Sequence, residues 1–354
     1  MTIGAAKDKQ ADEQDGEHEP MTTVNRQVLL TTRPPGIPQA EHFTISTAPV
    51  PEPGPGEFLV RNHYLGVEPA QRGWASAVAN YSDPVPLGSP MRGFGAGEVV
   101  ASRHPEFRVG ERLVGMFGWQ SHALSRGEEV THRVKGDEHP LSAYLGVLGV
   151  SGMTAYFGLL DVGRPKAGET VLVSTAAGAV GSAVGQIARL KGCRTIGIAG
   201  GPVKAAICRE DFRYDKGLDY KSPGFEKELA EACAAGVDVY YDNTSGRISD
   251  AVLAHLNVGA RVVICGTASV ASWDPWPQGP RVERRLLVKR ASMAGFLVTD
   301  HTARYEEAIA QLSAWVKSGD LRYREEILDG IESAPDAIAG LYRGENLGRR
   351  VIRL

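Results

Sequence analysis

Short runs of alternating or β-branched residues dominate the first third of the chain. They lie at residues 26–32, 41–47, 56–67, 95–102 and 111–119, and glycine- and proline-rich segments separate them. None of these runs shows a helical period. Many short strands divided by turn residues are typical of a barrel-like β domain. We therefore predict a β-rich domain in this part of the chain.

The pattern changes after Leu145. Helical patterns at 181–192 and 249–258 now alternate with apolar runs that predict strands at 170–174, 195–200, 237–242, 261–266 and 292–298. Such alternation is typical of a doubly wound parallel sheet. A longer helical pattern follows at 302–319, and a short strand is predicted at 349–354.

Composition adds limits to this α/β fold class. The 354 residues are 42% hydrophobic and 23% charged, which is ordinary for globular proteins and sufficient for two domains. A net charge of −3 gives no excess of positive charge with which to bind nucleic acid.

The uncharged stretches 140–160 and 170–188 are interrupted by glycine and polar residues, so neither predicts a membrane span. Residues 1–20 are rich in acids and poor in large apolar residues, and we expect a disordered acidic tail.

Cysteine and histidine placement argues against a metal site. The four cysteines are scattered, without a Cys-x-x-Cys pair, which fits a reducing, cytoplasmic location. The β-rich part contains no cysteine, and its histidines fall on turn-rich or strand-edge segments, where surface or hydrogen-bonded side chains are expected. These histidines are His42, His63, His104, His122 and His132. We predict that the protein holds no metal.

The most informative motif follows the strand predicted at 170–174. It reads Ala176-Ala-Gly178-Ala-Val-Gly181 and opens a helical pattern, which is the dinucleotide-binding fingerprint with alanine at the first glycine position. Gly178 allows the backbone to approach a pyrophosphate, and Gly181 allows close packing of helix on strand. The helix N-terminus supplies free N–H groups for the phosphates.

The next predicted strand distinguishes the two nicotinamide cofactors. Folds that bind NAD usually place an acid at its end to hold the ribose 2′-hydroxyl. This chain reads Gly200-Gly-Pro-Val-Lys204, with no acid before Glu210. A 2′-phosphate is attracted by Lys204 and meets no carboxylate there, so we predict NADP(H). The alternative is that Lys204 only begins a solvated helix.

At this point the chain resembles a known family, the zinc-free medium-chain dehydrogenases/reductases, in the branch of prostaglandin (leukotriene), curcumin and plant double-bond reductases. The resemblance runs from about residue 25 to the C-terminus. It rests on Val67-Glu-Pro-Ala-Gln-Arg72, Met91-Arg-Gly-Phe-Gly95, Ser151-Gly-Met-Thr-Ala-Tyr156, Ala177-Gly-Ala-Val-Gly-Ser182, Lys191-Gly-Cys193, Tyr241-Asp-Asn243, Ile264-Cys-Gly266, Gly295-Phe-Leu-Val298 and Gly344-Glu-Asn-Leu-Gly348.

The resemblance implies a GroES-like barrel domain beside a Rossmann domain, and a homodimer. It places the substrate domain at 21–145, the NADP-binding domain at 146–316, and a C-terminal return to the substrate domain at 317–354. The expected cofactor contacts are Gly178, Ala179, Val180, Gly181, Ser182, Lys204, Tyr220, Asn243, Cys265, Gly266, Thr267, Ala271, Phe296, Leu297, Val298 and Asn346. Without the family, Phe296–Val298 would be interpreted as a buried strand and Tyr220 as a half-exposed strand residue.

Two departures from the family pattern affect catalysis. The family usually carries a tyrosine near the substrate carbonyl where this chain has Ala271, and its Asp-Pro-Tyr-Met-Arg motif becomes Glu68-Pro-Ala-Gln-Arg72. A developing enolate then needs another hydrogen-bond donor. We predict Tyr81, which lies in a turn-rich segment just before Met91-Arg-Gly-Phe-Gly95. The alternatives are the cofactor's ribose hydroxyl or a water, with Tyr81 only packing or lying at the surface.

The resulting hypothesis is an NADPH-dependent ene-reductase, which transfers hydride to the β-carbon of an α,β-unsaturated ketone or aldehyde. Two alternatives remain open: a quinone reductase on the same fold, and an NADPH-binding protein without catalytic activity. In each case the expected partners are small molecules, with neither nucleic acid nor membrane.

Overall fold

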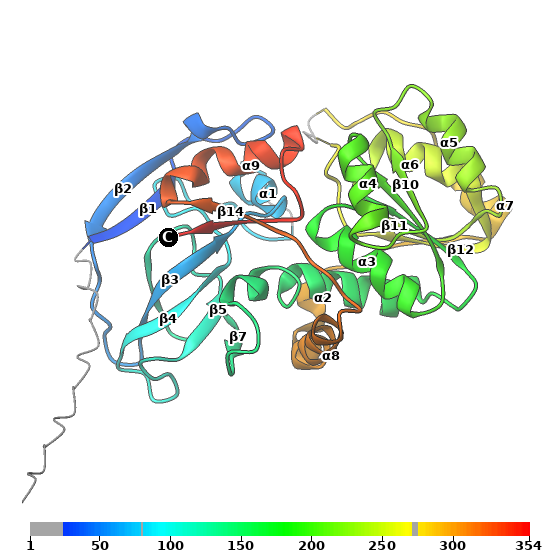
Figure 1. Ribbon diagram of the computed structural model, residues 1–354. Coiled ribbons are helices and arrows are strands. Elements are labelled where there is room, and N and C mark those ends of the chain that lie inside the picture. Colours follow the sequence, from blue (N-terminus) through cyan, green and yellow to red (C-terminus); the bar gives the residue numbers. More distant parts are fainter. Residues whose placement is uncertain (1–23, 79–80, 271–274) are drawn as a thin grey trace, which may run out of the picture.

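The computed structural model describes residues 24–78, 81–270 and 275–354. Figure 1 shows a β-rich part, coloured blue to cyan, beside an α/β part, coloured green to yellow, while the red C-terminal segment returns to the β-rich part. The α/β fold class predicted from the sequence is confirmed. The predicted acidic tail, residues 1–20, lies outside the described residues.

A seven-stranded, mainly antiparallel sheet forms the β-rich part. The strand order is β14-β15-β3-β4-β5-β7, with β6 paired to β3, and a hairpin of β1 and β2 forms a separate two-stranded sheet. The strands are β1 (Val24–Leu30), β2 (Phe43–Pro49), β3 (Phe58–Gly66), β4 (Gly95–Ser102), β5 (Arg112–Gly115), β6 (His122–Ser125), β7 (Val130–Val134), β14 (Glu325–Asp329) and β15 (Arg349–Arg353).

Helical segments also occur in and beside this part, although the sequence of the first third of the chain shows no helical period. They are η1 (Ala40–His42), α1 (Ala70–Ala75), η2 (Leu141–Leu145), η6 (Ile331–Ser333) and α9 (Ala334–Arg343). Helix α1 has six residues, fewer than two turns, which is too short to establish a period of 3.6 residues. It nevertheless buries Gln71, Trp74 and Ala75.

The α/β part is a six-stranded parallel sheet with the order β10-β9-β8-β11-β12-β13. Chain order reverses between β8 and β11, the crevice where such sheets bind dinucleotides. The strands are β8 (Thr170–Ser174), β9 (Arg194–Ala199), β10 (Lys216–Asp219), β11 (Val237–Asp242), β12 (Leu256–Ile264) and β13 (Ser292–Gly295). The helices are α2 (Val150–Phe157), η3 (Gly158–Gly163), α3 (Ala179–Leu190), α4 (Pro202–Glu210), α5 (Phe225–Ala232), α6 (Gly246–Val252), η4 (Leu253–His255), α7 (Glu283–Lys289), η5 (Val298–Arg304) and α8 (Tyr305–Ser318).

Two predicted elements have different limits in the structure. The helix predicted at 249–258 ends in the short η4, and β12 already begins at Leu256, where Leu256 packs into the core beneath the sheet. The strand predicted to reach Val298 ends at Gly295, at the outer edge of the sheet.

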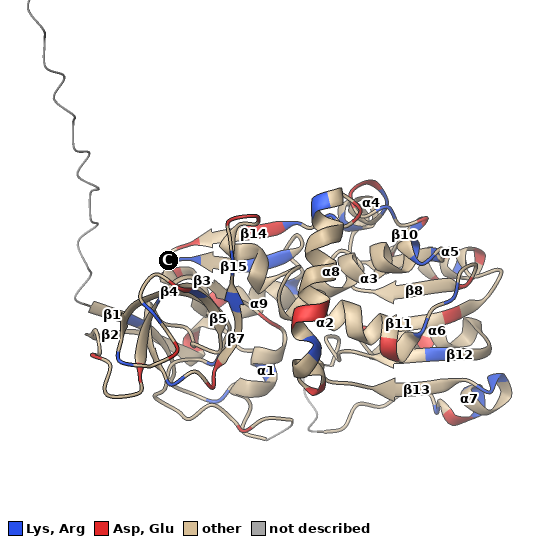
Figure 2. Cartoon of the chain, turned by 90° about the horizontal axis from the view of Figure 1, so that it is seen from below, with Lys and Arg blue, Asp and Glu red and all other residues tan. Residues whose placement is uncertain are grey.

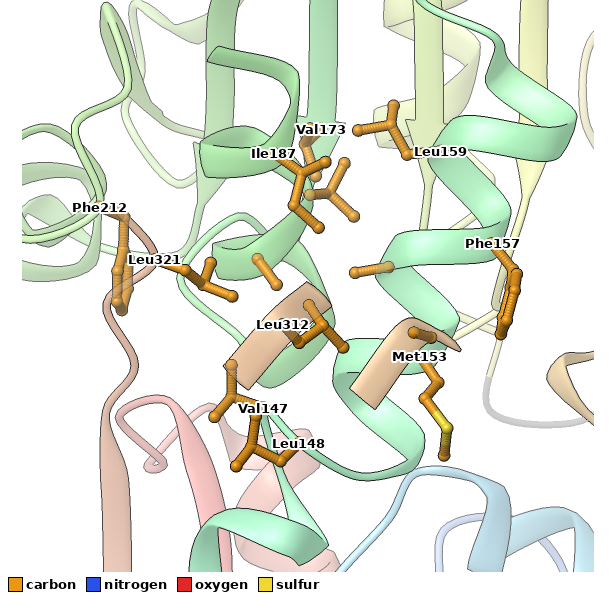
Figure 3. Close-up of a cluster of buried hydrophobic side chains, with 14 of the residues drawn as sticks. Val147, Leu148, Met153, Phe157, Leu159, Val173, Ile187, Phe212, Leu312 and Leu321 are labelled. Atoms are coloured by element: carbon orange, nitrogen blue, oxygen red, sulfur yellow. The ribbon is translucent and has the colours of Figure 1, made fainter. Parts of the chain in front are cut away.

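A large apolar cluster joins the two parts. Side chains from η2, α2, α3 and α8 pack together with the strands of the parallel sheet, as Figure 3 shows for Met153 of α2, Ile187 of α3 and Leu312 of α8. Figure 1 places α2 and α8 beside each other between the two sheets. Because these helices come from distant segments, their packing fixes the β-rich part against the parallel sheet.

Segments near the C-terminus complete both parts. Strand β15 lies between β14 and β3, and the Arg349 side chain forms a buried ion pair with Glu68, just beyond the end of β3. Immediately before β15, Gly348 pairs in parallel with Gly178, which follows β8 of the other sheet. Among the described residues no helix is long and apolar enough to cross a membrane.

Candidate cofactor and substrate site

The fingerprint motif forms a tight turn between β8 and α3. Gly178 is the N-cap of α3, and its N–H donates to the carbonyl of Thr175 at 2.9 Å. A Cβ on Gly181 would lie 2.3 Å from the oxygen of Thr175, so only glycine lets the helix approach the strand this closely. A Cβ on Gly178 would meet only Thr175, at 3.0 Å. The turn therefore fits a bound pyrophosphate, with the N-terminus of α3 (Ala179, Val180, Gly181 and Ser182) beside it.

The C-terminal segment lies against this turn. Gly348 forms the bridge with Gly178, and the Asn346 amide donates to the Gly348 carbonyl at 2.9 Å. Sequence reasoning placed Asn346 among the cofactor contacts without an explanation for its position. The bridge provides one, because it brings residues far apart in the chain to one edge of the phosphate turn.

Residues at the carboxyl ends of β11 and β12 lie next to the end of β8. Asn243 donates its backbone N–H to the Ser174 hydroxyl at 2.8 Å and its amide to the Ser174 carbonyl at 2.7 Å. The backbone N–H groups of Cys265 and Gly266 both donate to the backbone carbonyl of Asp242, at 2.8 and 3.1 Å. Burial raises the pKa of the Cys265 thiol to about 12, so the group stays neutral.

Lys204 and Tyr220 gather near the ends of β9 and β10. The ring of Tyr220 packs over Gly200, where a Cβ would approach it to 2.9 Å, and Lys221 lies 6.0 Å from the ring centre. The Asp219 carboxylate is bonded to the backbone instead of being free to bind a ribose hydroxyl. It accepts from the N–H groups of Gly201 and Lys221, at 2.7 and 2.9 Å. Burial, followed by the charge of Lys221, lowers the pKa of Lys204. Two cations thus lie at the predicted 2′-phosphate position, and Lys221 was missed by sequence reasoning.

The segment Phe296–Val298 lies just beyond β13. Phe296 fills the space above Gly158, where a Cβ would come within 2.4 Å of its ring, and Leu297 is 37% exposed. The Val298 carbonyl accepts from the Tyr305 hydroxyl at 3.1 Å. These residues are half-buried or exposed and lie outside the strand, so the alternative of a buried strand is wrong.

Arg72 on α1 links the β-rich part to the predicted cofactor loop. Its guanidinium donates to the carbonyls of Thr267, at 3.3 Å, and Val270. The guanidinium carbon also lies 5.1 Å from the ring centre of Tyr342 on α9, whose hydroxyl donates to the Pro69 carbonyl at 3.1 Å. The family motif contains this arginine, but nothing in the sequence indicates that it binds a loop 195 residues away.

Tyr81 lies beside α1 as an exposed residue with a partly enclosed hydroxyl. Burial raises the pKa of the phenol, the Trp74 indole opposes this rise, and the charges of Glu68 and Arg72 raise and lower it in turn. The phenol of Tyr81 therefore stays protonated at neutral pH. Ala271, at the position of the family tyrosine, lies outside the described residues.

No metal centre is visible in the part of the chain that the structure describes, where no three His, Cys, Asp or Glu side chains are placed to hold an ion. Two surface hollows of about 350 and 320 Å³ exist, the first lined by Gln186, Arg189, Leu190, Arg213 and Asp320. Neither contains a predicted site residue. The chemistry instead gathers where the two parts meet.

Comparison with known proteins agrees with this arrangement. Residues 26–132 match the family described as the N-terminal domain of oxidoreductase, and residues 179–314 match the zinc-binding dehydrogenase family. The chain is 42% identical to the NADPH-dependent curcumin reductase of Escherichia coli, over 93% of this chain and 97% of the relative. It is 34% identical to the NADP(+)-dependent 2-alkenal reductase of Nicotiana tabacum, over 93% of this chain and 97% of the relative.

A solved structure shows the same fold. CurA from Vibrio vulnificus, which has also been solved in complex with NADPH, matches with a TM-score of 0.88 and 42% identity, over 93% of this chain and 98% of that chain. The sheet order, the fingerprint turn and these full-length matches lead to one conclusion. The chain belongs to the medium-chain dehydrogenase/reductase superfamily, in the branch of the prostaglandin, curcumin and 2-alkenal reductases.

Proposed function

We propose that the protein is an NADPH-dependent reductase of the carbon–carbon double bond of α,β-unsaturated ketones and aldehydes. The observation that carries this proposal is the phosphate turn between β8 and α3, which the Gly178–Gly348 bridge joins to the segment that enters the β-rich part. The names of relatives that match over nearly the whole chain support it, since they include curcumin, 2-alkenal and (+)-pulegone reductases.

The cofactor-binding residues have distinct roles in this proposal. The N-terminus of α3 holds the pyrophosphate, while Lys204 and Tyr220, with Lys221 beside them, hold the 2′-phosphate. Asn243, Cys265, Gly266 and Thr267, together with Phe296, Leu297 and Val298, are proposed to border the nicotinamide, and Asn346 the phosphate turn; the expected contact Ala271 lies outside the described residues. When bound, NADPH supplies the hydride for the β-carbon of the substrate.

Tyr81 is the proposed catalytic residue. Hydride addition to the β-carbon places negative charge on the substrate's carbonyl oxygen, and a phenol O–H can donate a short hydrogen bond to it. Arg72 lies close enough for its positive charge to act on the phenol. The protein thus contributes position and electrostatic stabilisation, while water stays available as the final proton source for the α-carbon.

The experiment is a screen of NADPH oxidation with enones, enals, quinones and saturated aldehydes. Turnover of enones and enals, with a saturated ketone or aldehyde as product, supports the proposal. Turnover of quinones alone establishes the quinone reductase instead. Tight NADPH binding without oxidation by any acceptor would establish a binding protein without activity.

Replacing the phenol tests the role of Tyr81 directly. Tyr81→Phe should lower kcat by about 10²–10³-fold, the usual effect of losing one oxyanion donor, with the Kd for NADPH unchanged. Tyr64→Phe, in β3, is the matched control. Wild-type kcat in Tyr81→Phe would assign the stabilisation to a ribose hydroxyl or water.

We also propose a homodimer in the cytoplasm. The outer strand β13 lies at the edge of its sheet in Figure 2, and Leu287 and Val288 of the adjacent α7 are 77% and 58% exposed. An open edge beside exposed apolar residues favours association with a second copy. Light scattering should give twice the chain mass, and Leu287→Arg should lower it. Four free thiols support a reducing compartment.

The division of labour between domains follows from the same contacts. Residues 21–145 and 317–354 form the substrate side in this proposal, because β14 and β15 extend the sheet that contains β3. Residues 146–316 form the cofactor side.

A further inference from the structure

Trp74 has an unexplained polar group in the core of the β-rich part. The side chain is 5% exposed and packs with Val85 and Met91, yet its indole N–H is buried and donates to no acceptor among the described residues. Buried donors without an acceptor destabilise a fold and are rare. Trp119 in the same cluster shows the usual arrangement, since its indole N–H donates to the Gly66 carbonyl at 2.9 Å.

The segment that carries Tyr81 is held around this indole. The N–H of Val85 donates to the Trp74 carbonyl at 2.9 Å. The guanidinium of Arg92 lies 5.9 Å from the Trp74 ring centre and donates to the Ser82 hydroxyl at 2.7 Å and the Asp83 carbonyl at 2.8 Å. Three anchors therefore keep the segment 81–85 beside Trp74.

The indole acts on the phenol itself. Burial is the main cause that raises the pKa of Tyr81, and the Trp74 side chain is the first group that opposes the rise, which fits an indole N–H that lies near the phenolic oxygen without completing a hydrogen bond to it. The Tyr81 side chain is 55% exposed, so solvent reaches the ring. A phenolic oxygen can accept one hydrogen bond while its O–H donates another.

On the basis of the role proposed for Tyr81, we propose that Trp74 is a positioning residue, whose indole N–H donates to the phenolic oxygen of Tyr81 when an enone is bound. This bond fixes the rotation of the phenol and leaves its O–H for the carbonyl oxygen of the substrate. Because hydrogen bonds in a chain polarise one another, it also makes the phenol a stronger donor. The buried, unpaired N–H destabilises the substrate-free protein, but it is already in position to donate to Tyr81 when the substrate binds.

Paired tryptophan variants test this proposal. Trp74→Phe keeps an aromatic ring and removes the N–H, so kcat with an enone should fall about 3- to 10-fold. The Kd for NADPH should stay the same, and Tm should stay or rise, since an unsatisfied donor is gone. Trp119→Phe is the matched control: it should lower Tm, because the Gly66 carbonyl loses its donor, and leave kcat unchanged.

A double variant shows whether the indole acts through the phenol. Trp74→Phe should cause no further loss of kcat in a Tyr81→Phe background, and in the wild-type background it should move the alkaline limit of kcat to higher pH. Wild-type kcat in Trp74→Phe overturns the proposal but leaves the role of Tyr81 intact. Equal losses in both backgrounds, or a loss that follows a lower Tm, overturn it too. Wild-type kcat in Tyr81→Phe alone overturns the proposed function of Tyr81.

Discussion

Single side chains at the two ends of the site are controlled by different physical effects. In the proposed site Lys204 acts through its charge, and Lys221 is a second cation close enough to lower its pKa. Tyr81 acts through a proton that burial keeps on the phenol. In the proposed mechanism the first effect selects the cofactor and the second stabilises charge on the substrate, so variants of the two residues should change different kinetic constants.

Removing the charge of Lys204 should affect only the phosphorylated cofactor. Lys204→Ala should raise KM for NADPH about 10- to 100-fold, because loss of a charged hydrogen-bond partner costs about 1.5–3 kcal/mol, while NADH kinetics barely change. Lys227→Ala, on the outer face of α5 beside Glu231, is the control and should change neither KM. An equal loss with both cofactors would show that Lys204 does not bind the 2′-phosphate.

The protonation of Tyr81 should appear in the pH profile. A tyrosine ordinarily titrates near pH 10, and burial raises the pKa of this one. The donor form therefore persists through neutral pH, and kcat should hold to about pH 10 and fall only above it. Tyr81→Phe should lack this alkaline fall in its residual activity. A wild-type profile that falls near pH 8 would exclude Tyr81 as the titrating donor.

The element that joins these residues is α1, together with the loop after β12. Helix α1 carries Trp74 toward the segment of Tyr81 and Arg72 toward the carbonyls of Thr267 and Val270. A guanidinium can bond two carbonyls of one loop in a fixed geometry, whereas an ammonium is a single point charge. This contact holds the predicted nicotinamide loop against the β-rich part.

Arg72 can be tested as the link between α1 and this loop. Arg72→Ala should raise KM for NADPH about 5- to 30-fold and speed hydrogen exchange at Thr267–Val270, with Arg72→Lys restoring only part of the affinity. Arg33→Ala is a close control, because the Arg33 guanidinium donates hydrogen bonds to the carbonyls of Ala75 and Ser76 at the C-terminal end of α1 and not to the loop after β12. Unchanged exchange in Arg72→Ala would contradict a holding role.

Local sequence predicted those elements and site residues whose causes are local. The strand, glycine turn and helix of the fingerprint depend on neighbouring residues, so Gly178 and Gly181 were predicted with their roles. Strands β6, β7 and β10, of four or five residues, were missed because their pairing partners decide them rather than their own pattern. Arg72, Trp74 and Lys221 were missed as site residues for a similar reason, since their importance arises from contacts that only the folded chain creates.

At the scale of the molecule, the C-terminal segment connects the two sheets. Strand β15 fills the position between β14 and β3, and the Arg349–Glu68 pair is buried beside it. Burial raises the pKa of Glu68, and Arg349 opposes this rise. Each partner leaves one polar atom unpaired. The fold therefore tolerates these two buried charged groups only when both are present.

Breaking this pair should destabilise the protein strongly. Arg349→Met should reduce the free energy of unfolding by about 3–5 kcal/mol, because it leaves a buried carboxylate unpaired, and Glu68→Gln in addition should recover part of the loss. A carboxyl whose pKa is raised by folding favours the folded state most in its protonated form. Denaturant titrations of Arg349→Met should thus show stability falling as pH rises from about 5 to 8. A larger loss in the double variant than in the single one would contradict this account.

Activity of the whole enzyme should not depend on a metal. The described residues contain no cluster that could hold one, and the sequence lacks the cysteine and Gly-His-Glu ligands in its first part. Prolonged chelation should leave kcat unchanged, and elemental analysis should find no stoichiometric zinc. One bound zinc per chain, with activity lost on its removal, would disprove this prediction.

The bridge between Gly348 and Gly178 also has a consequence for biosynthesis. Gly348 follows Gly178 by 170 residues along the chain, so the phosphate turn leaves the ribosome well before its neighbour is made. Strand β3 likewise lacks its antiparallel neighbour until β15 has been made. A growing polypeptide that has not reached Gly348 should therefore lack one side of the phosphate turn and leave an edge of the β-rich sheet unpaired, a state in which aggregation competes with folding.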